Sequence, residues 1–182
     1  MTPFSGWLEG VTAIHSPNFN SRPENMPINM IVIHGISLPP AKFGGSYIEQ
    51  FFTNTLDCSL HPYFETVREK RVSAHFLIKR TGKIIQFVSV WDRAWHAGAS
   101  SFAGQANCND FSIGIELEGT DDIPYTSAQY RELAGLIRKL RILFPKITSN
   151  RIVGHSDIAP GRKMDPGAAF NWVLLRQNLK GP

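Results

Sequence analysis

The chain has 182 residues, of which 42% are hydrophobic and 19% are charged, a balance that is typical of a folded domain and excludes a disordered chain. The length is that of one domain, so we expect residues 1–182 to form a single domain. The net charge of +4 suits an anionic ligand, but the basic residues form no continuous stripe, and we expect no nucleic-acid partner.

The sequence carries no signal for export or for insertion into a membrane. Residues 1–10 contain neither a basic segment nor an apolar one, and no apolar run approaches the ~20 residues that a membrane span needs. We therefore expect a cytoplasmic protein without membrane contact. A chain of this length can bury enough surface to fold alone, so we expect a monomer. Cys58 and Cys108 are too few for a disulfide framework and are expected to be reduced thiols.

The N-terminal third of the chain predicts an arm, a buried strand and a short helix. Residues 1–27 are rich in Pro, Asn and Ser, which indicates an irregular arm. The apolar, β-branched run 28–33 predicts a strand buried on both faces that ends at His34 and Gly35. Residues 47–54 predict a short helix.

Three further strands are predicted in the middle of the chain. Residues 72–79 and 84–88 flank the turn residues 81–83 and predict a hairpin. Residues 111–117 alternate in polarity, as expected for a strand with one strongly apolar face. The residues predicted to share that face are Phe111, Ile113, Ile115 and Leu117.

The C-terminal third predicts the longest helix, at residues 126–144, which begins with a capping box formed by Thr126 and Gln129. The apolar stripe of this helix consists of Tyr130, Leu133, Ile137, Leu140 and Phe144. A strand, a loop and a closing helix follow at residues 147–155, 156–167 and 170–179. Because strands and helices interleave, we expect an α/β (α+β-like) fold with a mixed central β-sheet flanked by helices.

Two histidines and an aspartate stand where such folds place functional sites. His34 and His155 end predicted strands, and Asp165 lies in the loop after His155. Two imidazoles and a carboxylate form a common donor set for catalytic zinc, with the fourth position open to water. The spacing of ten residues between His155 and Asp165 fits neither one helix face nor one strand face. From the spacing alone, a core histidine hydrogen-bonded at a strand end and a turn aspartate are the favoured explanation of His34 and Asp165.

Three other residues could serve in a catalytic site. Glu116 lies two residues from Gly114, whose missing side chain leaves room, and could be a general base or an exposed strand glutamate. Lys163 could stabilise an oxyanion or could be a solvated loop lysine. Trp95, beside His96 in a loop, could stack on a sugar ring or pack in the core.

Several segments resemble a known family. Residues 30–34, 72–78 and 95–98 look like the corresponding parts of the zinc-dependent N-acetylmuramoyl-L-alanine amidases, a family that includes T7-type phage lysozyme and the peptidoglycan recognition proteins. The longer segments 108–120 and 154–167 are similar to those of the cytoplasmic members that cleave 1,6-anhydromuropeptides during cell-wall recycling. The resemblance covers nearly the whole chain.

The resemblance implies a metal centre and a catalytic pair. It implies that His34, His155 and Asp165 bind one zinc ion per chain, that Glu116 is the general base, and that Lys163 stabilises the oxyanion. The substrate contacts that it implies are Arg71 and Arg162, which would face substrate carboxylates, and Trp95, which would lie near the sugar.

The implied activity is hydrolysis of the amide between the lactyl group of (1,6-anhydro)-N-acetylmuramic acid and L-alanine, within peptidoglycan recycling and thereby β-lactamase regulation. The implied partner is a small-molecule anhydromuropeptide. This chain departs from relatives at Gly35, where they carry Asn, and at Asn107, where they carry a basic residue. Two alternatives are an amidase acting on intact peptidoglycan and a binding module without catalysis. The second is disfavoured because all three implied ligands are present.

Overall fold

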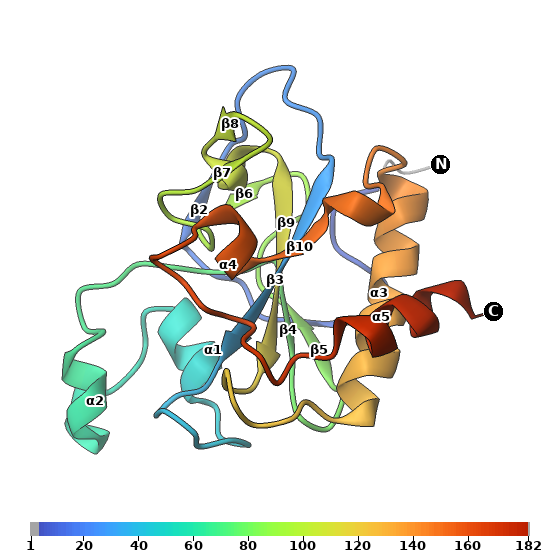
Figure 1. The fold of residues 1–182 in the computed structure, drawn as a ribbon. Helices are drawn as coiled ribbons and strands as arrows, with labels where there is room; N and C mark the ends of the chain where they lie inside the picture. The colour runs from blue at the N-terminus through green and yellow to red at the C-terminus, as the bar shows by residue number, and fades with distance from the viewer. Residues whose placement is uncertain (1–3, 182) are drawn as a thin grey trace.

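A six-stranded sheet forms the centre of the molecule, whose computed structural model describes residues 4–181. The strand order is β1–β5–β4–β9–β3–β10 (Figure 1). The strands are β1 (Thr12–Ala13), β3 (Met30–Ile36), β4 (Phe76–Ile78), β5 (Ile84–Gln86), β9 (Ser112–Glu118) and β10 (Ile152–Gly154). Only the β4–β5 pair is antiparallel, and the other pairs are parallel. The predicted mixed central sheet and the β4–β5 hairpin are confirmed.

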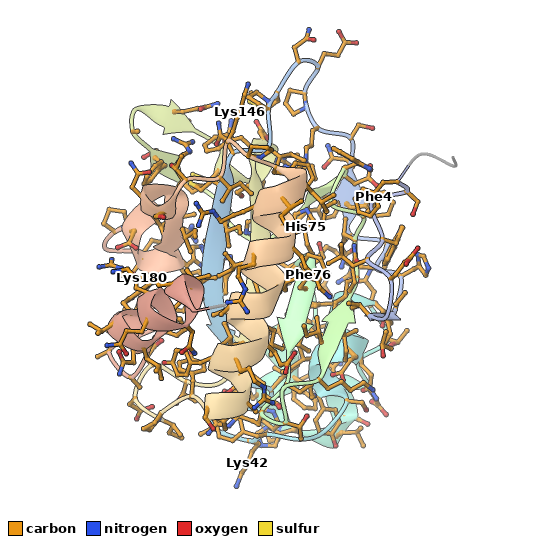
Figure 2. The ribbon with its side chains drawn as sticks, turned by 90° about the vertical axis from the view of Figure 1, so that its right-hand side faces the viewer. Phe4, Lys42, His75, Phe76, Lys146 and Lys180 are labelled. Atoms are coloured by element: carbon orange, nitrogen blue, oxygen red, sulfur yellow. The ribbon has the colours of Figure 1, made fainter. Side chains whose placement is uncertain are left out.

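Helices cover both faces of this sheet. Figures 1 and 2 show α3 (Ser127–Leu143) and α5 (Trp172–Lys180) packed together on one face. The opposite side carries α1 (Tyr47–Phe52), α2 (Pro62–Glu65) and α4 (His155–Ile158). The smaller elements are β2 (Phe19–Asn20), η1 (Cys58–Leu60), β6 (Arg93–Ala94), β7 (Ser101–Phe102), β8 (Gln105–Ala106), η2 (Cys108–Asp110) and η3 (Ser149–Arg151). No helix of the described residues is long and apolar enough to cross a membrane.

Side-chain alternation divides the core between the two faces. The odd-numbered residues of β3 and β9, such as Ile31 and Ile115, pack in one core cluster with residues of α3 and α5. Met30 and Val32 project to the other face. Full burial of each such side chain stabilises the fold by roughly 1.5–3 kcal/mol. Phe111 was predicted to share a face with Ile115, but it precedes β9 and packs with Met30 and Val32, so that prediction is wrong.

Helix α3 forms as predicted. Thr126 accepts a hydrogen bond from the Gln129 backbone, and the Gln129 side chain accepts one from the Thr126 backbone, which completes the capping box. All five residues of the predicted apolar stripe are buried. The Gln129 side chain also donates to the carbonyls of Ile78 and Glu118, so the cap fastens the helix to the ends of β4 and β9.

The N-terminal arm is less irregular than predicted. Strand β1 joins the main sheet, and β2 pairs with β6. After β1, the backbone N–H of Ile14 donates to the carbonyl of Gln86, so the arm continues along the edge of β5. Within the expected arm, residues 1–3 lie outside the described residues.

Several predicted boundaries are wrong. The strand that begins near residue 28 continues through Ile36, because its last residues pair with β9. The strands predicted at 72–79 and 147–155 contain only β4 and β10. Residue Ser73 bonds to the Trp95 carbonyl instead of a neighbouring strand, and the turn η3 precedes β10. The predicted loop 156–167 begins inside helix α4.

His75 makes a buried link between β4 and β9. Its Nδ1 accepts the backbone N–H of Gly114 at 3.0 Å, and its Nε2 lies 3.1 Å from the carbonyl of Asp92. Burial, aided by the charge of Arg22, lowers the pKa of His75 to about 3. Between this pKa and the value of about 6.5 expected in the unfolded chain, the unfolded state binds more protons. The contribution of His75 to stability is therefore complete above that range and is lost as the pH falls.

We expect His75→Asn, which keeps an acceptor for Gly114, to flatten the pH dependence of stability. Between about pH 4 and pH 6, the free energy of unfolding should rise with pH more steeply in the wild type than in His75→Asn. The difference between the two slopes should be at most about 1.4 kcal/mol per pH unit. Urea unfolding at a series of pH values measures both slopes. Parallel slopes for the two proteins would contradict this assignment.

Candidate metal centre and catalytic site

The site begins with the pairing of two parallel strands. His34 on β3 lies directly opposite Glu116 on β9, and both side chains belong to the sheet face that carries Met30 and Val32. The prediction that His34 ends its strand is wrong, because β3 continues for two residues beyond it. The register therefore places an imidazole and a carboxylate next to each other beneath α4.

A loop that folds back supplies two further donors. His155 is the first residue of α4, immediately after β10, which pairs with β3. The backbone N–H of Ser156 donates to the carbonyl of Asp165 at 3.0 Å, which returns the loop to the start of the helix. This bond explains how His155 and Asp165 meet despite a spacing that suits no regular element.

The three side chains form a compact triangle of donor atoms. The Nδ1 atoms of His34 and His155 lie 3.0 Å apart, and Oδ2 of Asp165 lies 3.2 Å from the first and 3.0 Å from the second. A tetrahedral zinc ion with bonds of about 2.0–2.1 Å separates its ligands by about 3.3 Å. The donor set and its dimensions therefore fit a zinc ion.

Burial and hydrogen bonding together set the charge states that a metal ion requires. Burial lowers the pKa of His34 to about 4, and it lowers the pKa of His96 well below the ordinary value. Burial alone raises the pKa of Asp165, but hydrogen bonds from His155 and His34 outweigh this effect and hold the pKa below its usual range. The cluster thus offers a neutral His34 imidazole and an ionised carboxylate, which are the forms that coordinate metals.

Glu116 is a buried carboxylate with an unused oxygen. Its side chain is 9% exposed, and among the described residues its Oε2 has no hydrogen-bond partner. Burial, with a further contribution from Asp165 that Lys163 partly offsets, raises the pKa of Glu116 well above its ordinary value. The alternative of an exposed strand glutamate is therefore wrong. A carboxylate that retains affinity for protons in a dry site is suited to general base catalysis.

Glu118, two residues along the same face, is buried for a different reason. Its Oε1 accepts the backbone N–H of Gly44 at 2.7 Å, its Oε2 accepts that of Arg80 at 3.0 Å, and Lys79 lies 3.4 Å away. Glu118 is thus fully engaged in holding the loops together. The contrast leaves Glu116 as the carboxylate that is free to act.

A cavity of about 270 Å³ opens over these groups, and its lining includes Glu116, His155, Asp165 and Lys163. An adjoining hollow of about 230 Å³ shares His155 and Lys163 with it. The residues expected to contact substrate, Arg71, Trp95 and Arg162, all line this second hollow. Every predicted site residue except His34 lines one of these two depressions, and His34 lies directly beside His155 and Asp165.

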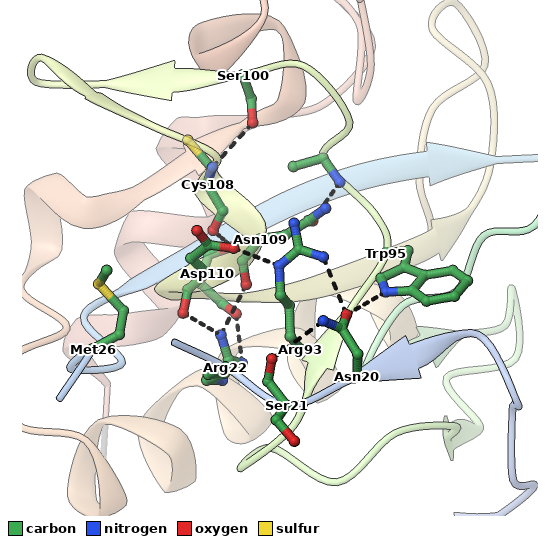
Figure 3. Close-up of polar contacts among 12 residues, drawn as sticks. Asn20, Ser21, Arg22, Met26, Arg93, Trp95, Ser100, Cys108, Asn109 and Asp110 are labelled. Atoms are coloured by element: carbon green, nitrogen blue, oxygen red, sulfur yellow. Dashed lines mark hydrogen bonds and ion pairs between the residues drawn. The ribbon is translucent and has the colours of Figure 1, made fainter. Parts of the chain in front are cut away.

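The three expected substrate residues differ in how firmly they are held. Trp95 donates from Nε1 to Asn20 at 2.7 Å, which fixes its ring in the wall (Figure 3). Arg162 donates to the carbonyls of Ala97 and Ala99 at 2.6 and 2.7 Å and so braces the neighbouring loop. Arg71 donates to the carbonyl of Arg68 at 2.8 Å at the rim. Their contacts with substrate stay a prediction.

In the sequence, His96 stands out only as the neighbour of Trp95 in a loop. The structure instead puts its Nδ1 2.9 Å from Nε2 of His34. The only sign of this contact in the sequence was the space predicted beside Gly114, which the His96 ring fills in the structure.

Comparison with known proteins identifies the family of this chain. The sequence profile of the N-acetylmuramoyl-L-alanine amidases matches residues 24–168, and the chain belongs to this family. It is 53% identical, over 96% of its length and 95% of the relative's, to the 1,6-anhydro-N-acetylmuramyl-L-alanine amidase AmpD of Haemophilus influenzae.

Solved structures show the same relationship. A crystal structure of an AmpD selenomethionine derivative superposes with a TM-score of 0.94 at 48% identity and covers 98% of this chain and 99% of its own. The amidase AmiD of Escherichia coli, solved with anhydro-N-acetylmuramic acid-L-Ala-D-γ-Glu-L-Lys, superposes with a TM-score of 0.61 at 31% identity and covers 86% of this chain and 60% of its own.

We expect the purified protein to hold one zinc ion per chain. We expect the His155→Ala variant to lose this ion, because the two remaining donors are too few to hold zinc at this buried position. Metal analysis after gel filtration measures the content. His15→Ala, which removes an exposed imidazole outside the cluster, is the matched control and should keep its metal. Equal zinc content in the two variants would exclude His155 as a ligand.

Proposed function

We propose that this protein is a zinc-dependent N-acetylmuramoyl-L-alanine amidase that hydrolyses the bond between the lactyl group of 1,6-anhydro-N-acetylmuramic acid and L-alanine in muropeptides. The observation that carries the proposal is that Glu116, a buried carboxylate whose Oε2 has no hydrogen-bond partner among the described residues, lines the cavity beside the cluster of His34, His155 and Asp165. Family membership and the named activity of the AmpD relatives support it.

In this proposal, His34, His155 and Asp165 would hold a zinc ion, which would supply a Lewis acid for the amide carbonyl and for water. The Glu116 carboxylate takes a proton from the attacking water as the new C–O bond forms. It then returns that proton to the nitrogen as the C–N bond breaks, so the products are a carboxylic acid and a free amine. Lys163 places a positive charge in the same cavity, where it stabilises the oxyanion.

The second hollow suits the remainder of a muropeptide. Trp95 offers an aromatic face to the sugar, and Arg71 and Arg162 supply positive charge for peptide carboxylates. A net charge of +4 favours the approach of such an anionic substrate. The proposal includes action as a monomer of one domain in the cytoplasm, within peptidoglycan recycling and the β-lactamase regulation that depends on it.

The direct test is hydrolysis of purified anhydromuropeptide, followed by chromatography of the released peptide. We expect release of the peptide to stop when a chelator removes the metal and to return when zinc is added. The reason is that the side chains of the donor cluster, without a metal ion, provide no strong Lewis acid. Insoluble peptidoglycan sacculi serve as the competing substrate and should be cleaved far more slowly. Full activity in metal-free protein, or a preference for sacculi, would contradict the proposal.

Glu116→Gln preserves the shape of the side chain but removes the base. We expect kcat to fall by about 10²–10⁴-fold while the zinc content stays that of the wild type. Glu69→Gln, an exposed carboxylate on the surface, is the matched control and should leave kcat unchanged. Turnover by Glu116→Gln at the wild-type rate would remove Glu116 from the role of base.

A further inference from the structure

The two adjacent residues His96 and Ala97 contact the Nε2 atoms of both histidines in the donor cluster. Nε2 of His34 lies 2.9 Å from Nδ1 of His96, and Nε2 of His155 lies 3.1 Å from the carbonyl oxygen of Ala97. Both histidines point Nδ1 into the cluster. An imidazole that coordinates through Nδ1 must carry its hydrogen on Nε2, and each Nε2 here has a neighbour that can accept it.

The direction of the hydrogen bonds at His96 follows from the groups beyond it. Oγ of Ser112 lies 2.5 Å from the carbonyl oxygen of Cys108, so its hydroxyl hydrogen must lie between these two oxygens. The Ser112 oxygen can then only accept from Nε2 of His96, which lies 3.3 Å away. A neutral His96 with its hydrogen on Nε2 has a free lone pair on Nδ1. His34 therefore donates to His96.

The surrounding chain is shaped to hold His96 in this position. A Cβ atom at Gly114 would lie 2.4 Å from Cγ of His96, so the ring needs the space that this glycine leaves on β9. Oδ1 of Asn109 accepts the backbone N–H groups of His96 and Ala97, at 3.1 and 2.8 Å. Arg22 in turn donates to the Asn109 carbonyl at 2.9 Å (Figure 3). These contacts fix the positions of both acceptors, Nδ1 of His96 and the carbonyl oxygen of Ala97.

We propose that His96 is a positioning residue of the metal centre, which holds His34 in the tautomer and orientation that present Nδ1 to a divalent cation. The carbonyl of Ala97 does the same for His155, so one segment aligns both imidazole ligands. The inference rests on the proposed metal site and adds to it a residue that no part of the catalytic scheme requires.

Two substitutions separate hydrogen bonding from packing. His96→Phe keeps a ring above Gly114 but offers no acceptor to His34, whereas His96→Asn keeps an acceptor near the position of Nδ1 but leaves part of the space empty. The measurement is zinc affinity, by competition of the zinc-loaded protein with a chromogenic chelator. We expect His96→Phe to bind zinc about 10–100-fold more weakly than the wild type, and His96→Asn to lose clearly less.

The opposite order, with His96→Asn the weaker binder, or unchanged affinity in His96→Phe, would overturn the inference and leave the proposed amidase intact. Absence of zinc binding in the wild type would overturn both. If His96→Phe does not fold, long-range ¹H–¹⁵N spectra of the zinc-loaded wild type decide the question. They should show hydrogen on Nε2 of both His34 and His96, and hydrogen on Nδ1 of His96 would refute the proposal.

Discussion

The parallel register of β3 and β9 is the constraint on which the rest of the site depends. It sets His34 beside Glu116 through main-chain hydrogen bonds. A shift of one residue in either strand would turn that strand's polar side chain toward α3, because successive residues face opposite sides. Burial of both faces of the sheet makes such a shift costly, so the hydrophobic core itself maintains the spacing of the reactive groups.

The remaining donors depend on how the loop after α4 is held. The hydroxyl of Tyr125 donates to the carbonyl of Pro166 at 3.0 Å, next to Asp165. A Cβ atom at Gly35 would lie 2.3 Å from that hydroxyl oxygen, so the glycine leaves the space that Tyr125 occupies. Gly35 is thus part of the support of the Asp165 loop.

Glu116 and Glu118 show how the same fold treats similar groups differently. Both are buried on one face of β9, where an unpaired carboxylate destabilises the folded state. Glu118 meets two backbone N–H groups and Lys79, whereas Oε2 of Glu116 meets none among the described residues. Stability alone favours the first arrangement. The second leaves a carboxylate oxygen without a partner among the described residues, on a side chain that lines the cavity, which suits proton transfer in an amide hydrolase.

The sequence by itself determined the central strands, helix α3 with its cap and the fold class, because periodicity and capping are local patterns that burial on the sheet reinforces. The positions of polar residues near strand ends and in loops indicated most of the candidate site residues, and resemblance to relatives supplied their roles and added Arg71 and Arg162. Only the tertiary structure decided where β4, β10 and α4 begin, how Asp165 reaches His155, and that His96 lies against His34. These features depend on hydrogen bonds between distant segments, such as Asn109 with Ala97, and on space left by Gly114, which leave no periodic trace in a sequence.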